Sequence, residues 1–284
     1  SRFFLLQKRI AQIKSWIKAC DDKDGRVHGR VMTLKTITGR MSHNSPNMAQ
    51  IPAVRSPYGK ECRDCWTVAD TSTHSIVGTD ASGLELRCLA HYMNDTTFTD
   101  ILLTGDIHTH NMKMAGLTDR DQAKTFIYAF MYGAGAAKIG KIVGAGAKEG
   151  QRLIDNFLSS MTALKRVRDG VTKASAKGKI KGIDGRLLYI RSPHSALNTL
   201  LQGAGAVVCK VWLINIMIRV RTLGVDAKLV ASIHDEYQFE VLNTDVKKFG
   251  QITKDAMKDT EKELHMKCPL DSEWKVGKTW SETH

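Results

Sequence analysis

The 284-residue sequence contains no run of 18 apolar residues, about the length that a helix needs to cross a bilayer. It also contains no internal repeat and no low-complexity tract. We therefore expect a globular chain without a membrane partner, long enough to bury a core and to divide into two lobes.

Cysteine is scarce and scattered. Six cysteines and no signal peptide fit the reduced thiols of a cytoplasmic protein. Cys62 and Cys65 form a single Cys-x-x-Cys pair, whereas a structural zinc needs four ligands. The sequence therefore disfavours a zinc site.

Acidic residues are the minority, with 29 against 42 lysines and arginines, which gives a net charge of +13. A pI of about 9.5 favours a polyanionic partner, usually nucleic acid. Charge alone leaves the alternative of a merely basic protein open.

An apolar stretch places a carboxylate at the end of a predicted strand. Residues 76–79 are predicted to be a short buried strand, Asp80 stands at its end, and a helix follows at once. Ser82 and Glu85 have the spacing of a capping box for that helix. An exposed carboxylate at such a position can bind a hard metal ion.

A second carboxylate stands at the tip of a predicted hairpin. Residues 229–233 and 237–241 alternate apolar and polar side chains, so His234, Asp235 and Glu236 are expected at the tip. If this hairpin pairs with the first strand, Asp80 and Asp235 converge. Two carboxylates sharing a site repel each other unless cations lie between them. The pattern predicts a phosphoryl-transfer site with two metal ions ~4 Å apart.

A third segment, residues 118–133, predicts an amphipathic helix with a capping pair at Thr118 and Asp121. Arg120, Lys124 and Tyr128 fall on one face of it, which suits a nucleoside triphosphate. The pattern fits a solvated basic face with an exposed tyrosine equally well. Ala123, Phe126 and Phe130 are expected to pack inward on another side.

The remaining segments predict a mixture of helices and strands. We expect helices over residues 1–20, near 148–158, and over 161–177, 196–222 and 245–265. We also expect a strand over 65–70, a glycine-rich connection over 140–150, a hairpin with an Asp-Gly turn over 183–191, and a polar tail with two tryptophans over 274–284.

Several polar residues in these segments suit nucleic-acid contacts. Arg40, Asn47 and Gln50 are donors of the kind that bind phosphates and minor-groove acceptors, although a plain surface loop explains them as well. Asn198 and Gln202 lie four residues apart on the long apolar helix, where a solvent-facing pair is the alternative. His108 is by default a packed or capping histidine.

The order of carboxylate strand, cationic helix and carboxylate hairpin resembles that of the family A DNA polymerases. Residues 80–87 are similar to motif A of the family, residues 120–133 to motif B and residues 234–236 to motif C, and residues 38–40 and 47–52 also match. The sequence between the motifs resembles that of the replicative polymerases of short-tailed phages more than that of bacterial DNA polymerase I. The resemblance runs from about residue 25 to the C-terminus.

This resemblance implies an α+β fold: a polymerase palm, which is an antiparallel sheet with packed helices, and mostly helical fingers. It implies a thumb-end helix over residues 1–20, palm over 21–110 and 183–284, and fingers over 111–182. The implied cofactors are two Mg²⁺ ions, held by Asp80, Asp235 and the Ala81 carbonyl, with Glu236 supporting the site.

The resemblance also implies roles for the other residues. Arg120 and Lys124 would bind the incoming triphosphate with help from His108, and Lys124 would act in catalysis. Tyr128 would stand where other members carry Phe, and Glu85 would exclude a ribose 2′-hydroxyl. Tyr132 would stack at the templating position. Primer and template contacts are implied for Arg40, Asn47, Gln50, Asn198, Gln202 and His234.

The sequence departs from the family pattern in two respects. Ala129 occupies a position that is usually Gly in motif B. The carboxylates of a proofreading exonuclease and most of a thumb are missing, which implies either a fragment or a separate chain that carries them. A processivity factor is not identifiable.

The expected function is template-directed transfer of dNTPs to a primer 3′-hydroxyl on DNA, in phage replication within the host cytoplasm. A partner-dependent or non-catalytic DNA-binding fragment is the alternative, but it requires neither both carboxylates nor Lys124. An RNA polymerase or a reverse transcriptase is disfavoured by Glu85 and the motif B spacing. A metal nuclease would not need the triphosphate helix.

Overall fold

The structure is a computed structural model that describes residues 2–283, and its chain divides into two compact units. Unit 1 comprises residues 1–82, 208–262 and 270–284, and unit 2 comprises residues 83–207 and 263–269. Helix α10 (Ala196–Thr222) contributes to both units.

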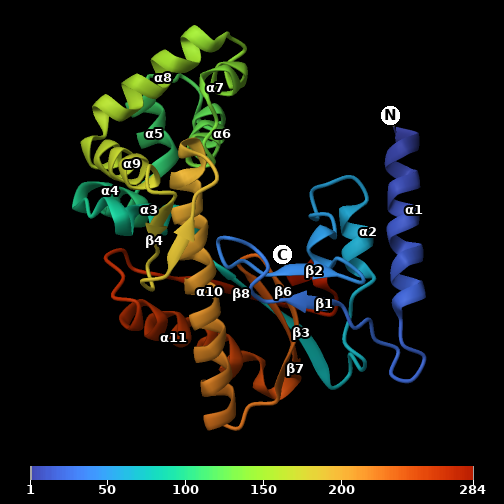
Figure 1. The fold of residues 1–284 in the computed structure, drawn as a ribbon. Helices are drawn as coiled ribbons and strands as arrows, with labels where there is room; N and C mark the ends of the chain where they lie inside the picture. Colours follow the sequence, from blue (N-terminus) through green and yellow to red (C-terminus); the bar gives the residue numbers. More distant parts are fainter. Residues whose placement is uncertain (1, 284) are drawn as a thin grey trace. The chain divides into compact units, whose positions relative to one another are not determined.

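Unit 1 is built on a four-stranded antiparallel sheet (Figure 1). Its order is β6-β7-β3-β8, with bounds Ala227–Ile233, Glu236–Leu242, His74–Ala81 and Ser272–Gly277. The hairpin predicted from alternation is therefore confirmed, and it pairs with the Asp80 strand as expected. Glu236, however, is the buried first residue of β7 and does not sit at the hairpin tip.

One face of this sheet packs against helices. Tyr237 meets Trp212 of α10 at a ring-centroid distance of 5.2 Å, and Phe239 meets Phe249 of α11 (Val246–Glu263) at 4.7 Å. These side chains are almost fully buried, so alternate residues of β7 form the apolar core of unit 1.

The opposite face carries Glu236, Gln238 and Glu240 of β7, which are polar yet buried. They lie under the N-terminal part of the chain and the C-terminal turn. These segments are α1 (Arg2–Ala19), β1 (Arg30–Met32), β2 (Ser42–Asn44), the 3₁₀ turn η1 (Met48–Gln50), α2 (Gly59–Asp64) and η4 (Trp280–Thr283). The short turn η3 (Asn243–Asp245) connects β7 to α11. Trp16 and Trp280 belong to the apolar cluster on this side.

Unit 2 is mostly helical (Figure 1). Its elements are α3 (Leu84–Met93), α4 (Thr96–Thr104), α5 (Ile107–Ala115), α6 (Arg120–Met131), α7 (Ala136–Ile142), α8 (Ala147–Ser160), α9 (Thr162–Ser175), the hairpin β4–β5 (Lys179–Lys181, Leu187–Tyr189), η2 (Pro193–Ser195) and the start of α10. Phe126, Phe130 and Phe157 pack their rings together at its centre. The inward packing predicted for α6 is confirmed.

Some local predictions were wrong. Residues 65–70 form no strand but only an isolated bridge between Thr67 and Thr279, because the segment lies against the C-terminal turn rather than in a ladder. The tail over 274–284 has more structure than its polar sequence predicted, since it includes the last four residues of β8 and the buried Trp280. The connection over 140–150 contains the end of α7 and the start of α8.

The two predicted helix caps are shifted. Gly83, in a left-handed conformation, is the N-cap of α3 in place of Ser82, whose backbone N–H donates to the Asp271 carbonyl. Asp119 is the N-cap of α6 in place of Thr118, and its carboxylate accepts from the backbone N–H of Gln122. Cap spacing alone therefore located both helix starts to within one or two residues.

One helix, Pro193–Thr222, is long and apolar enough for a membrane span by length and composition, and 56% of its most apolar window is buried within protein. The same test is passed by core helices, so this finding is weak evidence for a span.

Candidate metal and nucleotide sites

The two candidate metal-binding carboxylates lie on neighbouring strands of unit 1. Asp80 is the penultimate residue of β3, and Asp235 lies in the two-residue turn between β6 and β7. The backbone N–H of Ala81 donates to the Asp235 carbonyl at 3.1 Å, which ties the turn to the end of β3. Asp80 is exposed and Asp235 half-buried. Both are hard oxygen donors, and Asp235 makes no ion pair with any residue in the described range 2–283.

Asp80 lies in a row of three acidic residues across the sheet. Asp80 lies opposite Glu236 on β7 and opposite Glu273 on β8. Directly opposite residues on antiparallel strands share a face, and like charges there are unfavourable. This crowding of negative charge, with Asp235 adjacent, suits a site that binds cations.

The hairpin turn also contains His234, whose charge acts on His43 of β2. His234 is exposed and has a φ of 57°, a left-handed conformation that is uncommon outside glycine. The pKa of His43, on β2, is lowered by burial and then by the nearby charge of His234. His43 was missed from the sequence, which offers no spacing signal linking it to the hairpin.

Glu236 is held by hydrogen bonds within the protein. Its Oε1 accepts from Trp280 Nε1 at 2.6 Å and from Gln238 Nε2 at 2.5 Å, and Arg63 Nη1 lies 3.9 Å away. Burial lowers the pKa of Arg63, while the charge of Glu236 raises it. Sequence reasoning missed Arg63, Gln238 and Trp280, because no local pattern links α2, β7 and the C-terminal turn.

In unit 2, helix α6 presents the predicted cationic face. Arg120 and Lys124 are exposed, and Tyr128 is half-buried with its ring 6.4 Å from that of His108 on α5. The pKa of His108 is lowered by burial first and then by the charges of Arg120 and Lys124. The structure therefore brings four of the predicted nucleotide-binding residues onto one side of the α5–α6 pair.

Asp106, which sequence reasoning did not assign to the site, is the N-cap of α5 and the partner of Arg120. Its carboxylate accepts from Arg120 Nε at 2.7 Å and from Nη2 at 3.1 Å. These bonds hold the pKa of Asp106 well below its usual range. A bidentate pair fixes the plane of the guanidinium.

Glu85 and Tyr132 are also brought together within unit 2. The Tyr132 hydroxyl donates to Glu85 Oε1 at 2.6 Å, although the two residues are 47 positions apart. Gly133 follows with a φ of 77°, and a side chain there would place its Cβ 2.2 Å from the His194 carbonyl oxygen. The end of α6 is therefore fixed against the segment that begins α10.

The predicted DNA contacts occupy both units. Arg40, Asn47 and Gln50 lie between β1 and α2 in unit 1, and Asn198 and Gln202 lie on α10 in unit 2. Among buried polar atoms in the described part of the chain, Ser42 Oγ, Asn44 Oδ1 and Asn47 Oδ1 have no hydrogen-bond partner. Three such atoms within six residues indicate a segment with capacity for a polar ligand.

A geometric cluster of metal-binding groups that sequence reasoning did not identify occurs elsewhere in unit 1. Asp21, Asp24 and His28 can bring one ligand atom each within 4.8 Å of the others, and all three are exposed. Asp24 already pairs with His28 at 2.8 Å.

Comparisons with known proteins agree with the geometry. The model of the family described as "DNA polymerase family A" matches residues 3–282. The chain is 40% identical over 318 residues to the DNA-directed DNA polymerase of Enterobacteria phage T3 and 39% identical to that of Escherichia phage T7. Each alignment covers 99% of this chain and 45% of the phage protein, so the chain spans less than half the length of these relatives.

Bacterial relatives are more distant. The thermostable DNA polymerase I of Thermus filiformis is 28% identical over 92% of this chain. A solved structure, described as the POL domain of Pol1 from M. smegmatis in complex with DNA primer-template and dNTP, superposes with a TM-score of 0.86 at 22% identity. That match covers 96% of this chain and 51% of the solved one, and it confirms the predicted α+β class.

Proposed function

Because this chain belongs to DNA polymerase family A, we propose that it catalyses template-directed addition of dNTPs to a primer 3′-hydroxyl. The palm would comprise residues 21–110 and 183–284, the fingers 111–182, and residues 1–20 would be the end of a thumb. The proposed setting is phage DNA replication in the host-cell cytoplasm, with polymerisation but no exonuclease activity in this chain.

The observation that carries the proposal is the convergence of Asp80 and Asp235 at one end of the sheet. With the Ala81 carbonyl, they form a set of oxygen donors that suits two Mg²⁺ ions. Such ions, when bound, stabilise charge on the attacking and leaving oxygens of a phosphoryl transfer. Asp80 and Asp235 would hold them there, while the buried Glu236 would support the geometry of the turn.

The cationic face of unit 2 would bind the incoming dNTP. Arg120 and Lys124 would neutralise the triphosphate, and Lys124 would also stabilise charge that develops during transfer. Arg120 already gives Nε and Nη2 to Asp106, which leaves Nη1 for a phosphate oxygen. His108 and Tyr128 would complete this face.

Sugar and base selection would depend on the Glu85–Tyr132 pair. A hydrogen bond of 2.6 Å holds the Glu85 carboxylate in one position. A fixed side chain excludes a ribose 2′-hydroxyl better than a mobile one, since a mobile one could move aside. Tyr132, whose side chain is 46% exposed, would offer its ring to the templating base.

Primer and template would be held by Arg40, Asn47, Gln50, Asn198, Gln202 and His234. The net charge of +13 supports this role, because phosphate neutralisation supplies most of the affinity of proteins for nucleic acid. The unpartnered buried atoms of residues 42–47 support it further. A separate chain carrying a thumb or an exonuclease would be an additional partner.

The test is extension of a short primed template by the 284-residue chain with Mg²⁺ and four dNTPs. Asp235→Asn is expected to abolish extension while leaving binding of the primed template unchanged. The control is Asp226→Asn, which removes an exposed carboxylate at the opposite end of the hairpin and should extend normally. Normal extension by Asp235→Asn would show that the site is wrong. Absence of extension by the wild-type chain, with DNA binding retained, would favour the partner-dependent fragment.

A further inference from the structure

The buried polar residues of β7 connect the candidate metal site to the C-terminal turn. Glu236, Gln238 and Glu240 alternate along β7 on the face that carries Asp80, and they are 6%, 2% and 5% exposed. Each has a partner. Glu240 pairs with Arg26 at 2.8 Å, Gln238 Oε1 accepts from Thr283 at 2.8 Å, and Glu236 accepts from Trp280 and Gln238.

Trp280 is fixed on three sides. Its backbone N–H donates to the Trp66 carbonyl at 3.0 Å, its indole Nε1 donates to Glu236, and the guanidinium of Arg63 lies over its ring at 4.4 Å. Arg63 is itself buried and donates Nε to the Pro52 carbonyl at 3.0 Å. The indole therefore contacts both a buried arginine and a buried carboxylate, which also lie 3.9 Å from each other.

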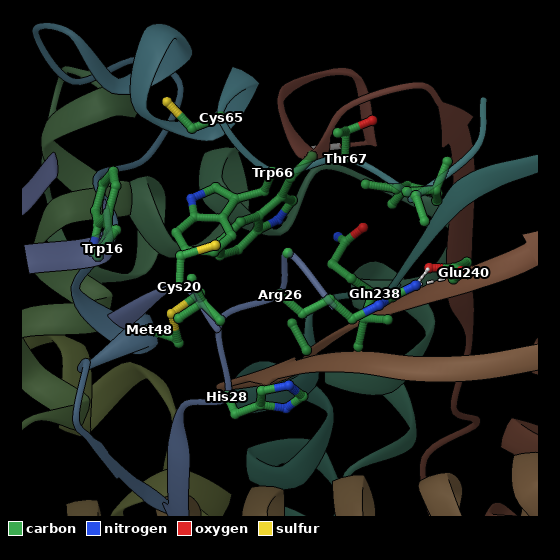
Figure 2. A pocket seen from close by; sticks show the side chains of 18 of the residues that line it. Trp16, Cys20, Arg26, His28, Met48, Cys65, Trp66, Thr67, Gln238 and Glu240 are labelled. Carbon is green, nitrogen blue, oxygen red and sulfur yellow. Dashed lines mark hydrogen bonds and ion pairs between the residues drawn. The ribbon is translucent and has the colours of Figure 1, made fainter. Parts of the chain in front are cut away.

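These side chains are almost fully buried, and part of their surface borders a cavity. Trp280 and Gln238 form part of the wall of a cavity of about 750 Å³, which also borders Trp16, Trp66 and Arg26. Figure 2 shows Gln238 beside the Arg26–Glu240 ion pair, with the rings of Trp16 and Trp66 further along the cavity. Where a side chain borders a cavity it has fewer packing neighbours on that side, so its hydrogen bonds contribute to holding its orientation.

Glu236 has a reason to be restrained. It directly follows Asp235 in sequence and lies opposite Asp80 in register. A third mobile carboxylate at this position would compete with Asp80 and Asp235 for cations and would repel both of them. Two short hydrogen bonds and a nearby guanidinium instead hold its charge inside the protein.

We propose that Trp280 and Gln238 are positioning residues that hold Glu236 away from the metal site and thereby keep Asp80 and Asp235 as its cation ligands. Arg63 packs over the Trp280 ring and so helps to hold Trp280, and through it Glu236, in place. The inference rests on the proposed function, because it assigns these residues to the site at Asp80 and Asp235.

The test variant is Trp280→Phe, which removes the N–H donor to Glu236 and keeps an aromatic ring under Arg63. The matched control is Trp16→Phe, a buried tryptophan of the same apolar cluster that makes no hydrogen bond to Glu236 within residues 2–283. The first readout is binding of Mn²⁺, used as a spectroscopic probe and followed by electron paramagnetic resonance. It needs no DNA and no activity, so it separates this inference from the proposed function.

Trp280→Phe should tighten Mn²⁺ binding by about tenfold, because the released carboxylate becomes an additional ligand. It should also lower kcat by about tenfold with an unchanged KM for dNTP, because Asp80 and Asp235 no longer hold the cation alone; a hydrogen bond to a charged group is worth a factor of this size. Trp16→Phe should change neither value. The effect of Trp280→Phe should disappear in a Glu236→Gln background, because the indole would then have no carboxylate to hold.

The inference would be overturned if Trp280→Phe behaved like Trp16→Phe, or if its effect were additive with that of Glu236→Gln. If Trp280→Phe does not fold, Gln238→Met serves instead, because it removes the second donor at nearly constant volume, and the same outcomes apply. A wild-type chain that binds Mn²⁺ through Asp235 but extends no primer would refute the proposed function and leave the Mn²⁺ comparison decisive for this inference.

Discussion

Replacing Gly150 with alanine should destabilise unit 2, although the same change usually favours a helix. Gly150 lies in α8, and an added Cβ would stand 1.9 Å from the Ala136 carbonyl oxygen and 2.6 Å from the Gly140 backbone nitrogen of α7. An ordinary contact begins at 3.4 Å, so the two backbones would have to separate by about 1.5 Å (3.4 − 1.9).

The size of the effect follows from two opposing contributions. Overpacking a close backbone contact costs about 3 kcal/mol, at the upper end of its usual range. The higher helical preference of alanine compared with glycine stabilises the helix by about 1 kcal/mol. The net loss of about 2 kcal/mol should lower the Tm by roughly 4–8 °C for a protein of this size.

The matched control is Gly170→Ala in α9, where no atom lies within 4 Å of the added Cβ and φ is not positive. It should raise the Tm by about 2–4 °C, because only the helical preference changes. Thermal unfolding followed by far-UV circular dichroism measures both variants. Equal increases in Tm for the two variants would show that α7 and α8 do not touch backbone to backbone.

Three further predictions concern the nucleotide-binding face of unit 2. Glu85→Ala should raise ribonucleotide incorporation by about tenfold or more. Tyr132→Phe should raise it less, because the carboxylate remains but loses its 2.6 Å hydrogen bond. Single-nucleotide insertion of ATP compared with dATP measures both variants, and unchanged ratios would exclude a role for the pair. Asp106→Asn keeps an N-cap for α5 but loses the charge that orients Arg120. The KM for dNTP should therefore rise by up to about fivefold while the Tm stays constant. A lower KM would contradict this prediction. Burial, followed by the charges of Arg120 and Lys124, lowers the pKa of His108, which favours the neutral imidazole; its protonation at acidic pH should favour binding of the triphosphate. The KM for dNTP should therefore fall with pH in the wild type but not in His108→Gln, and parallel profiles would refute the assignment.

Most of the helices could be predicted from the sequence because their signals are local. The face of α6 is set by residues three and four apart, and its inward side chains Ala123, Phe126 and Phe130 are buried as the period requires. Alternation likewise predicted the hairpin β6–β7. The strand predicted at 65–70 failed because a period of two in a short segment cannot say whether a partner strand is available.

The residues of the candidate site also fall into those that local sequence patterns predicted and those that they did not. Asp80, Asp235, Arg120 and Lys124 stand in local patterns that the chemistry of carboxylates and cations makes recognisable, so the sequence by itself determined them as candidates. Their roles in metal and nucleotide binding stay predictions.

Only the tertiary structure decided which residues support them. Arg63 and Trp280 lie 217 positions apart, and Asp106 reaches Arg120 from the cap of a different helix. These contacts depend on where separate elements pack, which is a property of burial and register over the whole chain. Short-range periodicity in the sequence cannot predict such contacts, because each residue fits its own helix, strand or turn equally well without its partner.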